Sequence, residues 1–246
     1  MSGEVQRHYD THLAPIYVWM VGDVAAALQR SLDFFAAAGL KPGAGGVTVD
    51  LGCGFGLQAI PLAELGHEVV ALDFSAELLA ELRTRAGALP IRAIQDDLRN
   101  FPRHLTVPAD VIVCMGDTLT HLPSLAAVNE LLRLTAANLA PGALLALTFR
   151  DHVGSELKGV QRFIPVRTDS DRILTCFLEY GDGVVDVHDL VHTRVPEGWR
   201  QSVSSYRKLR LEREGVAAEL SLLGLQILRH DVEQGLVTLL ARKSAA

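Results

Sequence analysis

Long apolar runs are missing from this 246-residue chain, although 49% of its residues are hydrophobic. No stretch approaches the ~20 consecutive apolar residues that a membrane-spanning helix needs. The first residues, which include Arg7, His8 and Asp10, also lack the apolar core of a signal peptide. These two absences predict a protein without a membrane partner.

Cysteine is scarce as well. The three cysteines, Cys53, Cys114 and Cys176, fall in apolar or loop segments, and their spacing is not that of metal ligands. An odd number of cysteines in an unexported chain favours reduced thiols and a cytoplasmic location. No metal site is predicted.

Positive charge is in deficit, because 23 Lys and Arg stand against 29 Asp and Glu, giving a net charge of −6. A nucleic-acid binder usually carries an electropositive surface, since phosphate contacts dominate its affinity. The balance therefore argues against nucleic acid and favours a small-molecule partner. The length suits one α/β domain, with monomer and homodimer both left open.

Strand-like and helix-like segments alternate through most of the chain. A helical segment over about 4–40 comes first, followed by helices that start near Leu57, Ser75 and Ser124. Between them lie five strand-like segments, at 47–51, 68–72, 91–95, 109–115 and 143–149. This alternation implies right-handed crossovers and a doubly wound, mainly parallel sheet covered on both faces.

The period changes to two after Arg150. Segments 173–180 and 184–192 alternate around a Gly181-Asp182-Gly183 turn, and 202–211 follows as a third strand. A helix at 212–223 and an antiparallel hairpin, 225–232 with 236–243, then complete a seven-stranded, Rossmann-like α/β sheet. The predicted single domain 1–246 thus comprises an N-terminal helical cap 1–45, a cofactor core 47–150, an antiparallel insertion 155–211 acting as substrate lid, and a return 212–246.

A glycine loop, Asp50-Leu51-Gly52-Cys53-Gly54-Phe55-Gly56, follows the first strand. Its glycines suit a tight turn that brings backbone close to a ligand, and doubly wound folds bind ligands at such strand ends. A purely structural turn is the alternative, but acids after later strands favour a cofactor site. A dinucleotide fingerprint needs a sixth-place glycine where this chain has Leu57, and Asp50 would face a pyrophosphate badly.

At these residues the sequence resembles the class I S-adenosylmethionine-dependent methyltransferases, whose first motif is an acid followed by G-x-G-x-G. Asp50, Gly52, Gly54 and Gly56 match it position by position. The resemblance covers 47–150 well and the closing hairpin loosely. It implies S-adenosylmethionine as methyl donor, S-adenosylhomocysteine as product, and a small-molecule acceptor whose methylated atom (N, O, S or C) stays open.

The resemblance also implies further cofactor contacts. Asp73, at the end of the second strand, corresponds to the acid that binds both ribose hydroxyls, although it could instead cap the next helix. Asp96 or Asp97 corresponds to the acid that meets the adenine amino group. The remaining implied contacts are those of Tyr17, Cys53, Phe74, Leu98 and Met115.

Methyl transfer is an in-line displacement that depends on alignment, and it needs a base only if the acceptor arrives protonated. His121 is the candidate base, with Asp117 to orient it or bind an amine, and Arg150 to clamp a carboxylate. The structural alternatives are a capping or carbonyl-bonded His121 and an ion-paired Arg150. Tyr9 or Tyr17 could close the site, or simply pack.

Two faces of the insertion carry polar side chains at spacings of two: Asp186, His188 and His192 on one strand, and Tyr206, Lys208 and Arg210 on another. We expect most of them to be solvated, with Tyr206 and Arg210 as exceptions. The rival functions are a non-catalytic S-adenosylmethionine-binding module and an NAD(P)-dependent oxidoreductase. The segment after Met115 lacks an Asn-Pro-Pro-Tyr-type tetrapeptide, which argues against methylation of planar amines in macromolecules.

Overall fold

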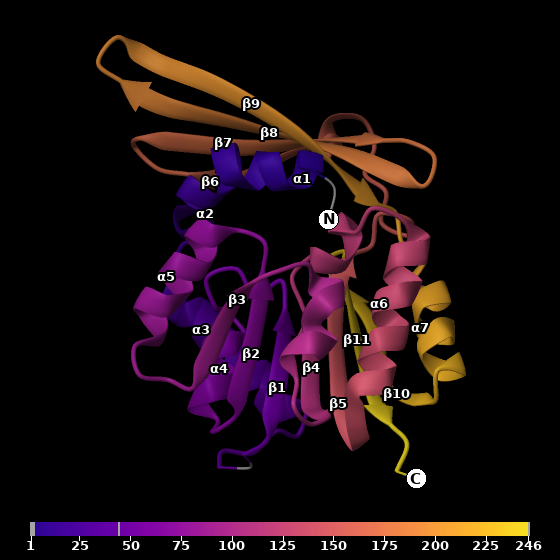
Figure 1. The fold of residues 1–246 in the computed structure, drawn as a ribbon. Helices are drawn as coiled ribbons and strands as arrows, with labels where there is room; N and C mark the ends of the chain where they lie inside the picture. The colour runs from indigo at the N-terminus through magenta and orange to yellow at the C-terminus, as the bar shows by residue number, and fades with distance from the viewer. Residues whose placement is uncertain (1–2, 44, 246) are drawn as a thin grey trace.

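The chain forms two sheets, a seven-stranded one in the core and a four-stranded one above it, in a computed structural model that describes residues 3–43 and 45–245 (Figure 1). The predicted domain 1–246 and helical cap 1–45 also take in residues 1, 2, 44 and 246, which lie outside the described residues. We call the core sheet sheet A and the upper one sheet B.

Sheet A has the order β10-β11-β5-β4-β1-β2-β3. Strands β1 to β5 and β10 run in one direction, and β11 lies antiparallel between β5 and β10. The strands are β1 (Val47–Leu51), β2 (Glu68–Asp73), β3 (Ile91–Gln95), β4 (Ala109–Cys114), β5 (Leu139–Arg150), β10 (Leu225–Glu233) and β11 (Leu236–Lys243). The predicted doubly wound α/β fold with a closing antiparallel hairpin is confirmed.

Helices cover both faces of sheet A. The apolar side chains of α6 (Leu125–Asn138), α7 (Arg213–Leu222) and the 3-10 helix η2 (Leu98–His104) share one core with the sheet. Those of α3 (Val24–Ala37), α4 (Ala59–Glu64) and α5 (Ala76–Ala86) share the other. Ser75 and Ser124 cap α5 and α6 by accepting the amides of Leu78 and Ala127, as their positions predict.

The N-terminal segment, expected to be helical over 4–40, is helical but broken. It comprises α1 (Gly3–His8), the π-helix η1 (Tyr9–Leu13), α2 (Ala14–Val21) and α3. Gly22 ends α2 with φ of 85°, a left-handed conformation that glycine adopts readily, and Asp23 caps α3 by accepting the amide of Ala26. The break folds α1 and η1 back toward sheet B.

Sheet B is the insertion, and it has four strands where the sequence analysis expected three. Its order is β6 (Phe163–Thr168), β7 (Arg172–Tyr180), β8 (Val184–Val195) and β9 (Gly198–Leu209). The expectation missed β6 because Pro165 and a register shift before Arg167 interrupt its alternation; Pro is tolerated there since β6 is an edge strand. It also placed the last strand at 202–211, whereas β9 begins at Gly198 and ends at Leu209.

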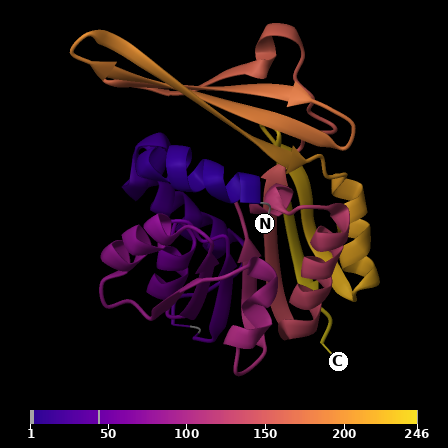
Figure 2. The same cartoon turned by 45° about the horizontal axis from the view of Figure 1, so that its top comes forward.

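Sheet B lies over the carboxyl ends of the parallel strands, with α1 between the two sheets (Figure 1). The tilted view shows the same layering and a β8–β9 hairpin that projects well beyond the core (Figure 2). Within residues 3–43 and 45–245 no single helix is long and apolar enough to cross a membrane; Val5–Val21 and Val24–Ala37, bent by 79°, pass that test only as a pair.

Candidate functional site

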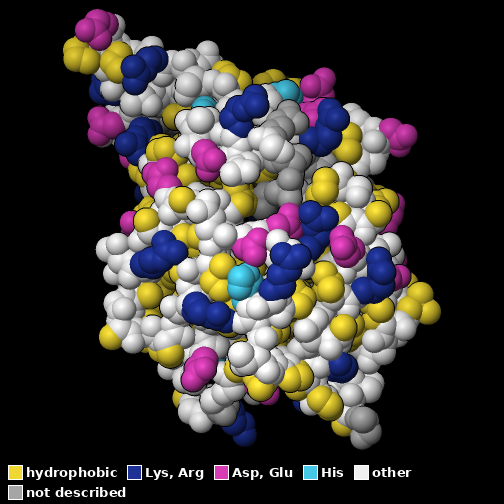
Figure 3. All heavy atoms as spheres, in the orientation of Figure 1, with side chains coloured by type: hydrophobic (Ala, Val, Ile, Leu, Met, Phe, Trp, Pro, Cys, Tyr) yellow, Lys and Arg dark blue, Asp and Glu magenta, His cyan; other side chains and the backbone are white. Residues whose placement is uncertain are grey.

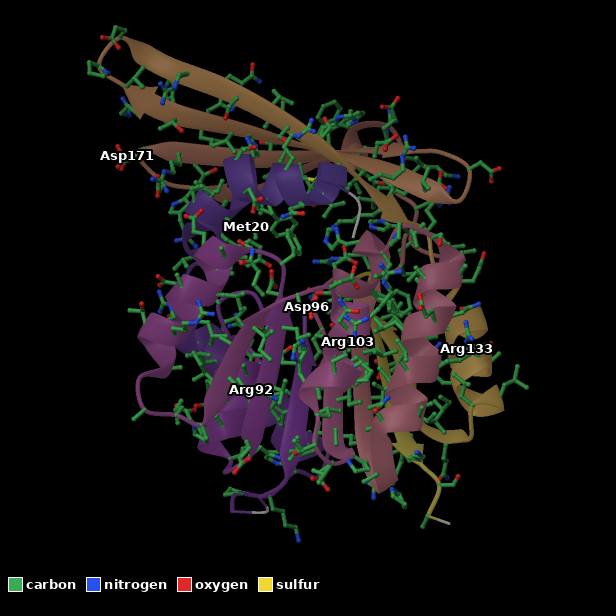
Figure 4. The ribbon with its side chains drawn as sticks, in the orientation of Figure 1. Met20, Arg92, Asp96, Arg103, Arg133 and Asp171 are labelled. Atoms are coloured by element: carbon green, nitrogen blue, oxygen red, sulfur yellow. The ribbon has the colours of Figure 1, made fainter. Side chains whose placement is uncertain are left out.

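A cavity of about 650 Å³ lies between the carboxyl edge of sheet A and the inner face of sheet B. Its walls come from the loops after β1, β4 and β5, from η1 and α2, and from β6 to β9. Met20 of α2 lies in the space between the sheets, above Asp96 at the edge of sheet A (Figure 4). This is the edge at which doubly wound sheets bind ligands, and the volume suits a small molecule.

The glycine loop forms the floor of the cavity through Gly52, Cys53 and Gly54. Gly52 has φ of 79°, and a Cβ there would lie 2.4 Å from Cγ2 of Thr118. Gly56 has φ of 100°, and its Cβ would lie 2.4 Å from Cδ1 of Leu82, although Gly56 itself is not among the cavity-lining residues. Glycine at these positions therefore both permits the left-handed backbone and keeps it close to its neighbours.

Two buried acids, Asp50 and Asp73, lie next to this loop. The carboxylate of Asp73 accepts the amide of Gly54 at 2.8 Å and that of Ser75 at 2.9 Å, and it is not the cap of α5, a role that belongs to Ser75. Asp50 is buried, and its Oδ2 has no hydrogen-bond partner among the described residues. Burial, and then the charge of Asp73, raise the pKa of Asp50 to about 8. Neither acid lines the cavity directly.

The structure does not bring the predicted adenine contacts to the cavity wall. Asp97 caps η2 and pairs with Arg99, with 3.0 Å from Nη2 to Oδ2, and this pairing lowers its pKa. Asp96 accepts bonds from Asn100 and His104, which lower its pKa. Leu98 is buried in the core of sheet A. The roles assigned to these three residues stay predictions.

Aromatic side chains of the N-terminal helices close one side of the cavity. The Tyr9 ring lies edge-on to Phe74, with 5.2 Å between ring centroids, and Tyr17 lies 6.0 Å from Phe55 in the same manner. Tyr9 and Tyr17 line the cavity together with Cys53 and Met115, while Phe74 stands behind Tyr9. Of the two alternatives for these tyrosines, packing and site closure, the structure supports both at once.

The loop after β4 carries Asp117, whose carboxylate is held from two sides. Its Oδ1 accepts the Arg150 amide at 2.9 Å, and its Oδ2 lies 2.5 Å from Nζ of Lys208 on β9. Burial opposes ionisation of Asp117, but Lys208 and two histidines outweigh it and lower its pKa to about 2. The Arg150 guanidinium lines the cavity and donates to the carbonyl of Gln234.

His121 ends the 3-10 helix η3 (Thr118–His121) and is buried against Tyr9 and Tyr206. Its Nε2 lies 3.4 Å from the Tyr9 hydroxyl, and its ring stacks on Tyr206 with 5.5 Å between centroids. Burial, and then Lys208, lower the pKa of His121 to about 3, so its ring is neutral near pH 7. Asp117, expected to orient His121 or to bind an amine, binds the Lys208 ammonium.

Sheet B contributes side chains to the cavity wall that the sequence did not predict there. Lys208 was expected to be solvated, and this is wrong, because its side chain is 12% exposed and faces Asp117. Tyr206 is buried, and Arg210 binds Glu156 and the His152 carbonyl. These two residues are thus the expected exceptions to solvation. His152, also in the cavity wall, was missed. The only signal for Lys208 was its place two residues after Tyr206 on one strand face.

Charged side chains of both signs are interspersed over the face shown in Figure 3, which agrees with the net charge of −6. Across the described residues, no group of three or more His, Cys, Asp or Glu side chains is arranged to hold a metal ion. The cavity therefore presents a glycine loop, one buried ion pair, two histidines and a set of tyrosines.

Residues 48–142, which contain the glycine loop and β1 to β4, match the family described as "Methyltransferase domain". These residues are therefore similar to a methyltransferase domain. The glycine/sarcosine N-methyltransferase of Halorhodospira halochloris is 32% identical to the chain over 124 residues, which are 50% of this chain and 46% of that relative. The chain spans less than half the length of the first curated relatives that it matches.

Solved structures of methyltransferases share the fold of the whole chain. The CcbJ methyltransferase of Streptomyces caelestis superposes with a TM-score of 0.77 at 20% identity, covering 97% of this chain and 98% of that one. CalS10, an amino pentose methyltransferase from Micromonospora echinaspora solved with bound S-adenosylmethionine, superposes with 0.74 at 20% identity, covering 94% and 96%. The methyltransferase fold thus includes sheet B as well as sheet A.

Proposed function

We propose that this protein is an S-adenosylmethionine-dependent methyltransferase acting on a small molecule held between the glycine loop and sheet B. The observation that carries the proposal is a single cavity joining the loop of a methyltransferase domain to the inner face of a second sheet. S-adenosylmethionine, when bound, supplies an electrophilic methyl group on a sulfonium. The residues fit this group, because the left-handed glycines leave room for it and the buried acids Asp50 and Asp73 behind the loop would favour its positive charge once they are ionised.

The chain's own residues are proposed to bind and align the acceptor. Neutral His121 can accept a hydrogen bond at Nε2 from the hydroxyl of Tyr9, and burial raises the pKa of Tyr9 well above its usual 10.0, so that the phenol keeps its proton. With a pKa of about 3, His121 is a weak base near pH 7. We therefore infer that His121 positions the acceptor, which arrives in its nucleophilic form, and that alignment supplies much of the acceleration.

Sheet B is proposed to act as the lid of the site. Its inner face excludes water from the cavity, and its contacts with α1 and with Asp117 fix its position. The named relatives include an N-methyltransferase for glycine and sarcosine and a methyltransferase for an amino pentose, which supports a small acceptor. We propose a reducing, cytoplasmic setting for the three free thiols; the monomer-or-homodimer question and the methylated atom stay open.

The first experiment measures binding of labelled S-adenosylmethionine and its conversion to S-adenosylhomocysteine with a panel of amines, thiols, phenols and imidazoles. We expect the protein to bind S-adenosylmethionine, to show no affinity for NAD(H) or NADP(H), and to turn over one class of acceptor. Binding without turnover by any acceptor would favour the non-catalytic module, and binding of NAD(H) alone the oxidoreductase.

Two variants distinguish a residue proposed to bind the cofactor from one proposed to align the acceptor. Asp73→Ala should weaken S-adenosylmethionine binding strongly, because it releases the Gly54 amide and removes the proposed ribose ligand. Exposed Asp33 on α3 is the matched control, and Asp33→Ala should bind normally. His121→Ala should bind the cofactor normally and lower turnover. An unchanged affinity in Asp73→Ala would contradict the proposed ribose contact.

A further inference from the structure

The inner face of sheet B is divided into a covered half and an open half. Strands β8 and β9 are covered by α1, where the His8 ring stacks on Tyr206 with 4.1 Å between centroids. Nδ1 of His8 also lies 2.8 Å from Oγ of Ser204, and Nε2 lies 3.2 Å from Oδ2 of Asp189. The N-terminal helix thus covers this half of the face through these polar contacts, and its Val5 packs with Val185 and Val187 in one apolar cluster.

The open half belongs to β6 and β7, and its side chains that face the cavity are mostly apolar. Ile164 lies opposite Cys176 in the β6–β7 register, and Leu174 and Leu178 follow at spacings of two on the same face of β7. Val166 and Leu157 extend this surface. These residues form the apolar roof of the cavity: Leu157, Ile164, Val166, Leu174, Cys176 and Leu178. Leu174 and Leu178 are already buried, at 1% and 5% exposed, so the other four supply the apolar surface that a ligand can cover.

Most charged side chains of the cavity lie away from this roof, and the exception is Asp189 on β8, which lines the cavity opposite Cys176 in the β7–β8 register. Asp117, Arg150 and His152 come from the loops after β4 and β5, at the edge of sheet A. Lys208 lies on β9, level with Val185 on β8, and Val185 in turn pairs with Tyr180 on β7. Lys208 and Asp117 also neutralise each other. The cavity therefore has a polar end beside sheet A and an apolar end under β6 and β7.

The apolar end is fixed in place by the tip of α2. The indole Nε1 of Trp19 donates to Asp169 in the turn between β6 and β7. The guanidinium carbons of Arg167 and Arg172 lie 5.6 and 5.8 Å from the Trp19 ring centroid, within range of a cation–π contact. A roof held this way presents a preformed apolar surface, on which water would find few polar partners.

We propose that the acceptor is amphipathic: its nucleophilic head lies at the polar end beside His121 and Tyr9, and an apolar body of several carbons lies under Leu157, Ile164 and Val166. This inference rests on the proposed methyltransferase function and names the substrate class of the same site. A small zwitterion such as glycine would leave the apolar surface wetted and gain nothing from it. An apolar body would remove that surface from water, which is favourable in proportion to its area.

The test is calorimetric titration of n-alkylamines, from butylamine to octylamine, into the full chain with and without saturating S-adenosylhomocysteine. The amine head is constant along the series, so each added methylene reports only the apolar end. Burial of one methylene strengthens binding by up to about fourfold, and we expect the dissociation constant to fall by that order per carbon. Ethanolamine, which has the head without the body, should bind most weakly.

Matched variants locate the effect. Ile164→Asn places an amide on the cavity side of β6 and should flatten the dependence on chain length. Phe163→Asn changes the neighbouring residue, which is 54% exposed on the opposite face of the same edge strand, and should preserve it. Val166→Asn serves in place of Ile164→Asn if that variant does not fold.

The outcomes separate this inference from the function it rests on. A dissociation constant that does not fall with chain length in the unmodified protein, or one that responds equally to Ile164→Asn and Phe163→Asn, overturns the apolar body. Failure to bind S-adenosylmethionine and S-adenosylhomocysteine, with the chain-length dependence intact, overturns the proposed function and leaves an apolar binding site.

Discussion

Nζ of Lys208 lies 2.5 Å from Oδ2 of Asp117, and this ion pair joins sheet B to the loop after β4. The two residues are 91 positions apart, and their side chains are 12% and 16% exposed. Because both charges are largely withdrawn from water, removing one partner leaves the other unpaired in a poorly solvated site. The pair therefore fixes both the lid and the charge balance of the cavity.

Lys208→Met should destabilise the protein by roughly 3–5 kcal/mol at neutral pH, the range for breaking a buried pair. Asp117→Asn combined with Lys208→Met should recover part of the loss, since no unpaired charge remains. Urea unfolding of the single and double variants measures both effects. A Lys208→Met variant as stable as the parent would show that the pair is not formed in solution.

The buried imidazole of His121 should make the protein acid-sensitive. Its pKa is about 3 in the fold and 6.5 in an unfolded chain, so the unfolded state binds more protons as pH falls below 6.5. The stability from neutral His121 is complete above pH 6.5 and is lost as pH falls toward 3. By pH 5 the loss from this one group is about 2 kcal/mol.

His121→Asn should therefore lose less stability than the parent between pH 7 and pH 5, as measured by urea unfolding at each pH. The variant must be compared with the parent because other groups also change the stability on acidification. His152, whose pKa is lowered, adds a further loss of stability, while Asp50, whose pKa is raised, adds a gain. Exposed His230 is the control, and His230→Asn should follow the parent. Parallel curves for His121→Asn and the parent would refute a neutral buried ring.

Asp50 should couple cofactor binding to proton release. The pKa of its carboxyl is raised to about 8, so a large fraction of the free protein carries a proton there near pH 7. Arrival of a positively charged ligand favours the carboxylate, so affinity for S-adenosylmethionine should increase as pH rises toward 8, by up to about tenfold per unit.

Calorimetry in buffers of different ionisation enthalpy counts the released protons. S-adenosylhomocysteine, which lacks the sulfonium charge, should release fewer of them, and Asp50→Asn should abolish the release that depends on pH. Equal proton release in Asp50→Asn and the parent would assign the coupling to another group.

Replacement of Gly52 by alanine should weaken cofactor binding. Gly52→Ala places a methyl group 2.4 Å from Thr118 on a backbone with φ of 79°, beside the cavity. Gly142→Ala has a similar φ of 76° with nothing within 4 Å of its Cβ. Both should lose about 1–2 kcal/mol from backbone strain. Only Gly52→Ala should weaken S-adenosylmethionine binding, and similar affinities in the two variants would contradict the glycine-loop assignment.

The order of elements and the glycine loop could be predicted from the sequence because both rest on local patterns. The β-branched run at β1, the caps Ser75 and Ser124, and glycines at left-handed positions each record a constraint between residues near one another in the chain. Strand β6 was not predicted because Pro165 and a register shift break its alternation within six residues.

The sequence by itself thus determined a parallel α/β sheet, its strand ends, and a loop for a charged nucleoside-type cofactor. Only the tertiary structure decided which side chains face the cavity. Alternation places Tyr206 and Lys208 on one face of β9, but burial depends on whether another element covers that face, and α1 and the loop after β4 do so. In the same way Asp97 follows the end of β3 as expected, yet the neighbouring Arg99 binds its carboxylate. A pattern fixes the direction of a side chain, and its partner is fixed by distant segments that the pattern does not contain.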